Sequence, residues 1–200
     1  MEFIFQIAVL LFSVVIHEVS HGAVAYALGD PTAKNEGRLT LNPISHLDFF
    51  GSIVLPILMY MSAGFIFGWA KPVPYNPYNL KNQKYGPALV GIAGPLSNFL
   101  VAVVFGILIR FSYALSLPQA FLEIAFYIAF LNLILAVFNL VPIPPLDGSK
   151  ILFALLPARS TEFQANLERY GIFLLLIFIF FFSGIILPIV QFLLRLITGG

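Results

Sequence analysis

Two histidines and a glutamate occur together in HEVSH, at residues 17 to 21 of a 200-residue chain. Residues four apart lie one turn apart on the same face of an α-helix, so His17 and His21 can point at one metal ion. Glu18 is rotated by about 100° from His17 and flanks the same ion, where it can take a proton from metal-bound water. Two imidazoles and a carboxylate suit zinc, with a fourth position left for water. The motif therefore predicts a zinc site with Glu18 as general base.

The motif lies inside an apolar run, VLLFSVVIHEVSHGAVAYALG, at residues 9 to 29. Such a run predicts a membrane helix, in which an unpaired charge is costly and an ionisable residue indicates function. A chance match is the alternative. The chain has only three histidines and nine acidic residues, however, and two of those histidines and a glutamate fall in this run. We interpret the motif as a metal site, since a bound dication also explains how lipid tolerates the cluster.

A third protein ligand must come from elsewhere in the chain. The extended form of the motif has a third histidine ten residues after the first, but position 27 is an alanine. Asp147 follows an apolar helix, and its alternative role is to cap the next helix. The other candidates are in polar surroundings or at a helix start, where solvation or the helix dipole is sufficient explanation for a carboxylate. They are Glu36, His46, Asp48 and Glu123.

Composition places these residues in an integral membrane protein. Hydrophobic residues make up 60% of the chain and charged residues only 10%, whereas a soluble domain has roughly 25% charged residues. The net charge of +1 gives no case for a nucleic-acid partner, and the lack of cysteine excludes disulfides and thiolate ligands. We expect one membrane-embedded domain over residues 1–200.

The predicted fold is all-α, with about four full transmembrane helices. Apolar runs and their breaks place helices at about 3–28, 87–111, 121–141 and 170–197, with a short amphipathic helix at 149–156. Residues 51–69 are apolar but interrupted by proline and glycine, which predicts a re-entrant segment or a short spanning helix. The alternation in RLTL predicts a small β-hairpin near 36–42 at the membrane surface.

Lysine and arginine collect in three loops, at residues 30–50, 70–86 and 142–170. The positive-inside rule assigns such loops to the cytoplasm. All three can be cytoplasmic only if residues 51–69 dip into the membrane and return. The helix at 121–141 then runs toward the cytoplasm and brings Asp147 to the same side as His21. We therefore expect an outside N-terminus, an active site toward the cytoplasmic side, and Asp147 as the third ligand.

Three motifs in this order resemble those of the site-2 protease family of zinc intramembrane metalloproteases: HEVSH, GPLSN at 94–98 and FNLVPIPPLDG at 138–148. The resemblance covers nearly the whole chain. It implies that one Zn²⁺ is held by His17, His21 and Asp147, and that Glu18 is the general base. It also implies that the substrates are single-pass membrane proteins, cleaved within their transmembrane segments.

The chain resembles a compact member of that family, which we expect in a prokaryotic plasma membrane. We expect no PDZ-like domain between the motif helices and no nucleotide-sensing domain after residue 200. We therefore expect control to come from partners, from an initial cut elsewhere in the substrate, or from gating of the core.

Asn98 and Asn139 lie within apolar helices. Such an amide either bridges helices by hydrogen bonding or donates to the substrate carbonyl or its oxyanion. The family resemblance favours a place in the site for both. Pro142 and Pro144, with Pro145 after them, resist helix formation and hold an extended backbone. This segment either positions substrate or presents Asp147 as a rigid turn.

The polar segment after the first helix holds two further candidates. The strand-like residues 38–41 are suited to pairing with an unwound substrate by strand addition. His46 either gates the metal site or forms hydrogen bonds at the surface.

Two rival functions would use the same residues. A metal or proton transporter requires further ionisable residues along the other helices, which are nearly bare. A catalytically silent relative that only binds membrane helices has no use for an intact Glu18. The sequence therefore favours a zinc metalloendopeptidase.

Overall fold

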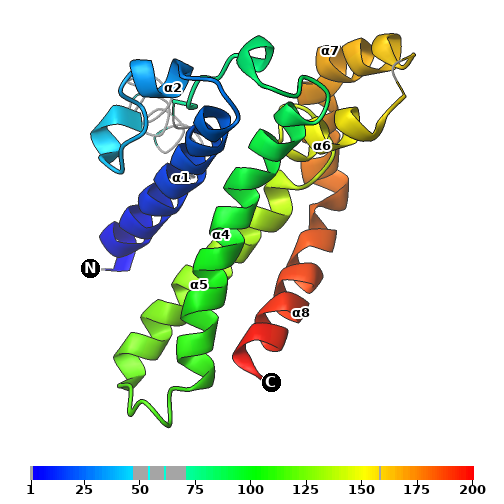
Figure 1. The fold of residues 1–200 in the computed structure, drawn as a ribbon. Coiled ribbons are helices and arrows are strands. Elements are labelled where there is room, and N and C mark those ends of the chain that lie inside the picture. The colour runs from blue at the N-terminus through cyan, green and yellow to red at the C-terminus, as the bar shows by residue number, and fades with distance from the viewer. Residues whose placement is uncertain (1, 47–53, 55–60, 62–70, 158) are drawn as a thin grey trace.

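The structure, a computed structural model, describes residues 2–46, 54, 61, 71–157 and 159–200, and these contain helices and no strand (Figure 1). A π-helical turn at Phe178–Phe182 and a 3-10 turn at Ser183–Ile185 join the last two helices. Two more 3-10 turns lie at Pro43–His46 and Pro77–Asn79. The α-helices are α1 (Glu2–Ala27), α2 (Thr32–Asn35), α4 (Gly86–Arg110), α5 (Gln119–Asn139), α6 (Gly148–Leu155), α7 (Thr161–Ile177) and α8 (Ile186–Thr198).

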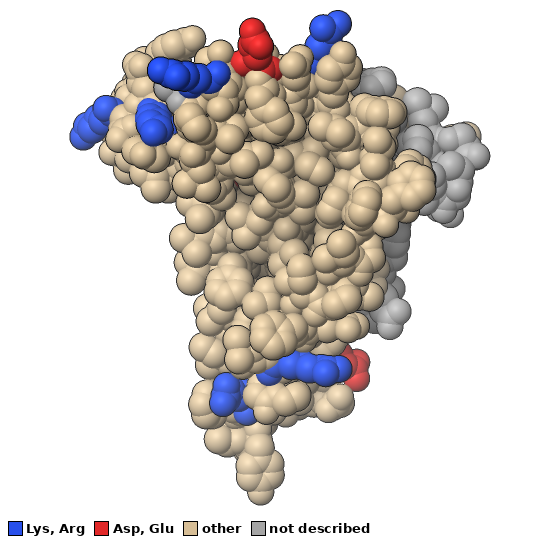
Figure 2. Space-filling model, turned by 90° about the vertical axis from the view of Figure 1, so that its right-hand side faces the viewer, with Lys and Arg blue, Asp and Glu red and all other residues tan. Residues whose placement is uncertain are grey.

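Among the described residues, four helical stretches are long and apolar enough to cross a membrane, as predicted: Ile4–Ala27, Gly86–Arg110, Gln119–Asn139 and Thr161–Thr198. The last begins at Thr161 and not near residue 170, because the polar turns of α7 continue into its apolar part without a break. Figure 2 shows charged side chains gathered at the two ends of the molecule, with an uncharged band between them. This distribution is the one expected of a protein that spans a bilayer.

Helix α4 lies at the centre of the bundle and packs against α1, α5, α6 and α8 (Figure 1). Lipid tails are as apolar as leucine, so membrane helices associate through close packing at small residues. Ala102 and Ala129 are such small residues in a buried cluster that joins α4, α5 and α8, where they pack with Leu133, Val190 and Leu194. Gly106 of α4 is similar, since a Cβ there would overlap the side chain of Ile197.

The order of the helices brings the second half of the chain back to the end of α1. The Lys81 N–H donates to the Leu28 carbonyl at 2.9 Å, so α4 starts at the end of the bundle where α1 finishes. Helix α4 runs away from that end and α5 returns to it, followed by α6 (Figure 1). The prediction of a re-entrant or short segment at 51–69 lies outside the described residues, apart from positions 54 and 61.

The predicted β-hairpin near 36–42 is wrong. Gly37 has a φ of +65° and, with Arg38, closes α2 through hydrogen bonds to the Lys34 and Ala33 carbonyls. The buried Arg38 guanidinium then donates to the carbonyls of Ser45, Lys71 and Pro72. The backbone of Gly37 and Arg38 therefore ends a helix, the Arg38 side chain bonds to distant carbonyls, and alternation alone did not reveal either feature.

Asp30 fastens the connecting segments to the end of α1. Gly29, with a φ of +109°, ends α1 in a Schellman motif, and the Asp30 N–H donates to the Ala25 carbonyl at 2.9 Å. The fully buried Asp30 carboxylate accepts hydrogen bonds from the Thr32 hydroxyl at 2.5 Å, the Asn76 N–H at 2.6 Å and the Asn79 amide at 2.8 Å. Residues 32 and 76–79 are thereby held together beside the end of α1.

The three hydrogen-bond donors favour the ionised form of the Asp30 carboxyl. Burial alone would raise the pKa of the Asp30 carboxyl, but the hydrogen bonds from Thr32, Asn79 and the Asn76 backbone outweigh burial and lower the pKa below 3.8. The resulting stabilisation is complete above pH 3.8 and is lost as the pH falls through the lower pKa of the folded state.

We predict that Asp30→Ala lowers the free energy of unfolding in detergent at pH 7 by about 2 kcal/mol or more, since buried donors lose a charged acceptor. The difference from wild type is expected to shrink below pH 3.8. Unfolding would be followed at several pH values, with Glu36→Ala as a control that removes an exposed carboxylate from the same region. Equal losses in the two variants, or a difference that stays constant with pH, would contradict this role of Asp30.

Candidate metal centre

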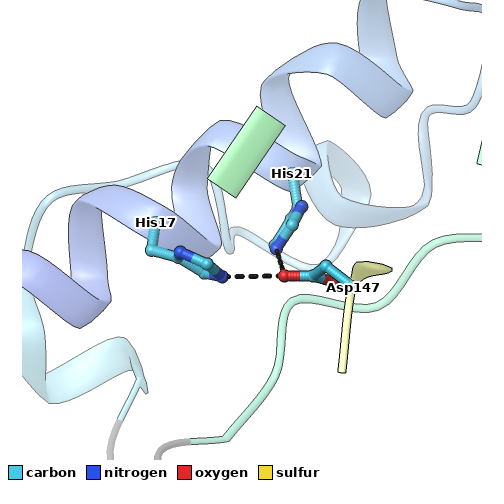
Figure 3. Close-up of side chains that lie close together, drawn as sticks. All are labelled: His17, His21 and Asp147. Atoms are coloured by element: carbon cyan, nitrogen blue, oxygen red, sulfur yellow. Dashed lines mark hydrogen bonds and ion pairs between the residues drawn. The ribbon is translucent and has the colours of Figure 1, made fainter. Parts of the chain in front are cut away.

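His17, His21 and Asp147 come together in the interior of the bundle (Figure 3). Asp147 Oδ2 lies 3.0 Å from His17 Nε2 and 3.1 Å from His21 Nε2. One ligand atom from each residue lies within 4.8 Å of the others, and each residue is only 6% exposed. Three potential metal-ligand atoms from two distant parts of the chain therefore face one small space.

The segment after α5 delivers Asp147 to the histidines. The chain turns through residues 140–147, and α6 begins at Gly148, where a Cβ would overlap the Leu140 and Val141 carbonyls. Asp147 occupies the N-cap position of α6, the alternative predicted from sequence, but its side chain makes no capping hydrogen bond. The carboxylate faces the histidines, so capping does not account for the residue.

The far side of each imidazole is held by another helix. His21 Nδ1 lies 2.6 Å from the Val90 carbonyl of α4. His17 Nδ1 lies 2.5 Å from Asn98 Oδ1, also on α4. A carbonyl oxygen can only accept, so each ring donates from Nδ1 and, when neutral, keeps a lone pair on Nε2. Both neutral imidazoles are therefore in the tautomer that can bind a cation through Nε2.

Gly94 keeps the space before the two Nε2 atoms open. A Cβ at this position would lie 2.5 Å from His17 Nε2 and 2.5 Å from His21 Nε2. Any larger residue would therefore occupy the region that the three donors face. This explains the glycine of the GPLSN motif, which includes Asn98 as well.

A cavity of about 240 Å³ opens on the cluster. Glu18 lines it beside the histidines, and Glu18 Oε2 accepts a hydrogen bond from the Val73 N–H at 2.8 Å. Asn139 lines the same cavity and donates to the Leu135 carbonyl of its own helix at 2.9 Å. A larger cleft of about 720 Å³ lies alongside, and Tyr75, Pro145 and Lys150 line both spaces.

Lys150 and Asn132 are two polar residues at the site that sequence reasoning missed. Lys150 Nζ lies 2.8 Å from Asp147 Oδ1, the oxygen that faces away from the histidines. Its spacing of three residues from Asp147 at the start of a helix was a usable signal. Asn132 is fully buried and donates to Ser13 beside Asn98. The usable signal there was an amide in an apolar run, two turns before Asn139.

The remaining sequence candidates lie in different surroundings. Glu36 is exposed, and the exposed Glu123 lies in the first turns of α5, at the opposite end from Asn139. Asp48 is outside the described residues. His46 is fully buried, and its Nε2 donates to the Thr40 carbonyl at 2.8 Å.

The two predicted prolines differ in exposure. Pro144 is buried and lines the larger cleft, whereas Pro142 is exposed. The next proline, Pro145, lines the cavity that opens on the metal-binding cluster.

Comparisons with known proteins point to one family of peptidases. The model of peptidase family M50 matches residues 115–181, which include Asp147. The Bacillus subtilis protein named "Putative zinc metalloprotease YwhC" is 41% identical over 179 residues, which are 86% of this chain and 78% of the relative.

More distant relatives come from other prokaryotes. Rip2 of Mycolicibacterium smegmatis is 30% identical over 88% of this chain and 66% of its own length. The zinc metalloprotease MJ0392 of Methanocaldococcus jannaschii is 29% identical over 92% of this chain and 45% of its own length. No solved structure matches the chain.

One assignment follows from three observations. The helices are long and apolar enough to span a membrane, two histidines and one aspartate form a cluster, and a relative is 41% identical over most of both chains. The chain belongs to peptidase family M50, the site-2 protease family, and is a zinc metalloprotease embedded in a membrane.

Proposed function

We propose that this protease cleaves peptide bonds within the transmembrane segments of single-pass membrane proteins. The observation that carries the proposal is the depth of the cluster in α1. His17 and His21 lie ten and six residues before the helix ends at Ala27, which is about 15 and 9 Å at 1.5 Å per residue. A peptide bond reaches that depth when it belongs to a segment that itself enters the membrane.

We propose His17, His21 and Asp147 as the zinc ligands. Two neutral imidazoles with free Nε2 lone pairs and one carboxylate are a donor set that zinc prefers, and Gly94 leaves room in front of them. Zinc held by these residues would supply a Lewis acid that polarises a carbonyl and lowers the pKa of water. Lys150 holds the outer oxygen of Asp147, so Oδ2 stays directed at the histidines.

We assign the general base to Glu18. Its carboxylate lines the cavity and is oriented by the Val73 N–H. Glu18 takes a proton from water as the water oxygen adds to the substrate carbonyl carbon. When the C–N bond breaks, Glu18 returns that proton to the leaving nitrogen. Asn139 also lines the cavity and uses one amide hydrogen on Leu135, so its second hydrogen is available to the substrate carbonyl oxygen.

The proposed orientation has the N-terminus outside and the site toward the cytoplasm. Arg110 and Arg195 lie near the ends of α4 and α8, away from the end where α1 finishes. The remaining basic residues belong to the segments at the α1 end: Lys34, Arg38, Lys71, Lys81, Lys84, Lys150, Arg159 and Arg169. This asymmetry supports a cytoplasmic α1 end. We propose that residues 1–200 act as one domain in a prokaryotic plasma membrane.

We predict that Glu18→Gln abolishes cleavage while the purified protein still binds zinc, because the amide cannot accept the proton but is not among the proposed ligands. The substrate would be a single-pass reporter in detergent, with zinc content measured on both preparations. General acid–base catalysis contributes about 10²- to 10⁴-fold, so a loss of at least 100-fold is expected.

Cleavage of the reporter by Glu18→Gln at the wild-type rate would rule out Glu18 as the base. Cuts placed only in the soluble flanks of the reporter would contradict intramembrane cleavage. A wild-type protein that binds zinc and cleaves none of a panel of single-pass reporters would favour the rival function of binding membrane helices without cleavage.

We also predict that Gly94→Ala reduces zinc binding by at least tenfold, because the added methyl group would lie 2.5 Å from both Nε2 atoms. Zinc would be titrated against a chelator of known affinity. Gly184→Ala is the matched control, since nothing lies within 4 Å of a Cβ at that glycine. Wild-type zinc affinity in a folded Gly94→Ala protein would contradict the proposed ligand set.

A further inference from the structure

A chain of buried polar groups leads from His17 away from the cavity. It consists of Ser13 on α1, Asn98 on α4 and Asn132 on α5, which are 4%, 0% and 0% exposed. Polar groups buried at this depth are costly unless they are hydrogen-bonded to one another. The chain joins three helices and ends on a proposed zinc ligand.

Backbone carbonyls determine which way both amides point. The Ser13 carbonyl can only accept, so the group of Asn98 that lies 3.1 Å from it is the Nδ2 amide. The Ile128 carbonyl, 2.9 Å from Asn132 Nδ2, orients the second amide in the same way. Asn132 Oδ1 then faces Asn98 Nδ2 at 2.8 Å, and Asn132 Nδ2 also donates to Ser13 Oγ at 2.9 Å.

These orientations leave Asn98 Oδ1 directed at His17 Nδ1. If the Asn98 amide were reversed, its oxygen would face both the Ser13 carbonyl and Asn132 Oδ1, and its nitrogen would face His17. His17 would then accept at Nδ1 and carry its proton on Nε2, a tautomer that cannot bind zinc through Nε2. Asn132 adds to the cost of that reversal, because it supplies one of the two acceptors that hold Asn98 Nδ2.

We propose that Asn132 is a positioning residue of the zinc site: acting through Asn98 and together with Ser13, it sets the tautomer and ring orientation of His17. This inference rests on the proposed assignment of His17 as a zinc ligand. It also redefines the role of Asn98. Both amide hydrogens of Asn98 are already donated, to Ser13 and Asn132. Asn98 therefore orients His17, and Asn139 is the asparagine that contacts the substrate.

The alternative is that Asn132 only bridges helices. Hydrogen bonds between membrane helices contribute modestly to stability, so a purely structural role predicts a less stable protein whose folded form binds zinc normally. A positioning role predicts weaker zinc binding in folded protein. Loss of a residue that orients a metal ligand typically weakens metal binding about 10- to 100-fold.

The test is a double-mutant cycle of zinc affinity on the full chain in detergent. We expect Asn132→Ala to weaken zinc binding by about tenfold or more and Asn98→Ala by at least as much. The double variant should bind zinc no more weakly than Asn98→Ala alone, because Asn132 acts through Asn98. Ser97→Ala is the control, since among the described residues that hydroxyl bonds to the Gly94 carbonyl of its own helix, and this variant should bind zinc as wild type does.

A second measurement reports on the site without activity. Co²⁺ in place of zinc gives an absorption spectrum that depends on its ligands, and Asn132→Ala should change this spectrum whereas Ser97→Ala should not. If Asn132→Ala fails to fold, Ser13→Ala decides, because it removes the hydroxyl that Asn132 uses and keeps the carbonyl that Asn98 uses. We expect this variant to bind zinc several-fold more weakly.

Wild-type zinc affinity in folded Asn132→Ala, or in Ser13→Ala where only that variant folds, would overturn the inference. Additive losses in the double variant would also overturn it. His17→Ala separates this failure from failure of the proposed function. If His17→Ala binds zinc normally, the ligand assignment itself is wrong. If it loses zinc while Asn132→Ala does not, only the role of Asn132 is wrong.

Discussion

The cost of charge in lipid governs the arrangement of this protein. His17, His21 and Asp147 lie in the interior of a bundle of apolar helices, where lipid cannot solvate them and each must find partners in the protein. Asp147 Oδ2 faces the two Nε2 atoms, and Lys150 binds the other carboxylate oxygen. The charge of Lys150 thus compensates that of Asp147, and the three ligand atoms face a single small space.

Close packing between helices follows from that requirement. Helix α4 must approach α1 so nearly that its backbone carbonyl at Val90 and its side chain at Asn98 reach the Nδ1 atoms of both rings. Gly94 permits the approach, since a Cβ there would collide with both imidazoles. The same helix therefore supplies the hydrogen bonds behind the ligands and the free space in front of them.

The polar segments at the end of the bundle are held by side chains and not by sheet pairing. The Asp30 carboxylate accepts hydrogen bonds from residues 32, 76 and 79. The Arg38 guanidinium donates to the carbonyls of Ser45, Lys71 and Pro72. One consequence is that residues 71–73 pass beside α1, where the Val73 N–H reaches Glu18. The position of the proposed general base therefore depends on a segment remote in sequence.

Sequence alone determined the properties that depend on local spacing. The length of an apolar run predicts a membrane helix, and a separation of four residues places His17 and His21 on one helical face. Four spanning helices, the amphipathic α6 and the M50 family assignment all followed from such patterns. The return of Asp147 to the histidines also followed, because the loop charges and the number of crossings restrict where the chain can go.

Tertiary structure alone decided the properties that depend on competition between distant groups. RLTL alternates like a strand, but Arg38 turns inward to carbonyls up to 34 residues away, so no hairpin forms. Asn98 and Asn139 look alike in sequence, yet one amide lies behind His17 and the other lines the cavity. Which donor meets which acceptor is set by the packing of three helices, and no pattern within one helix contains that information.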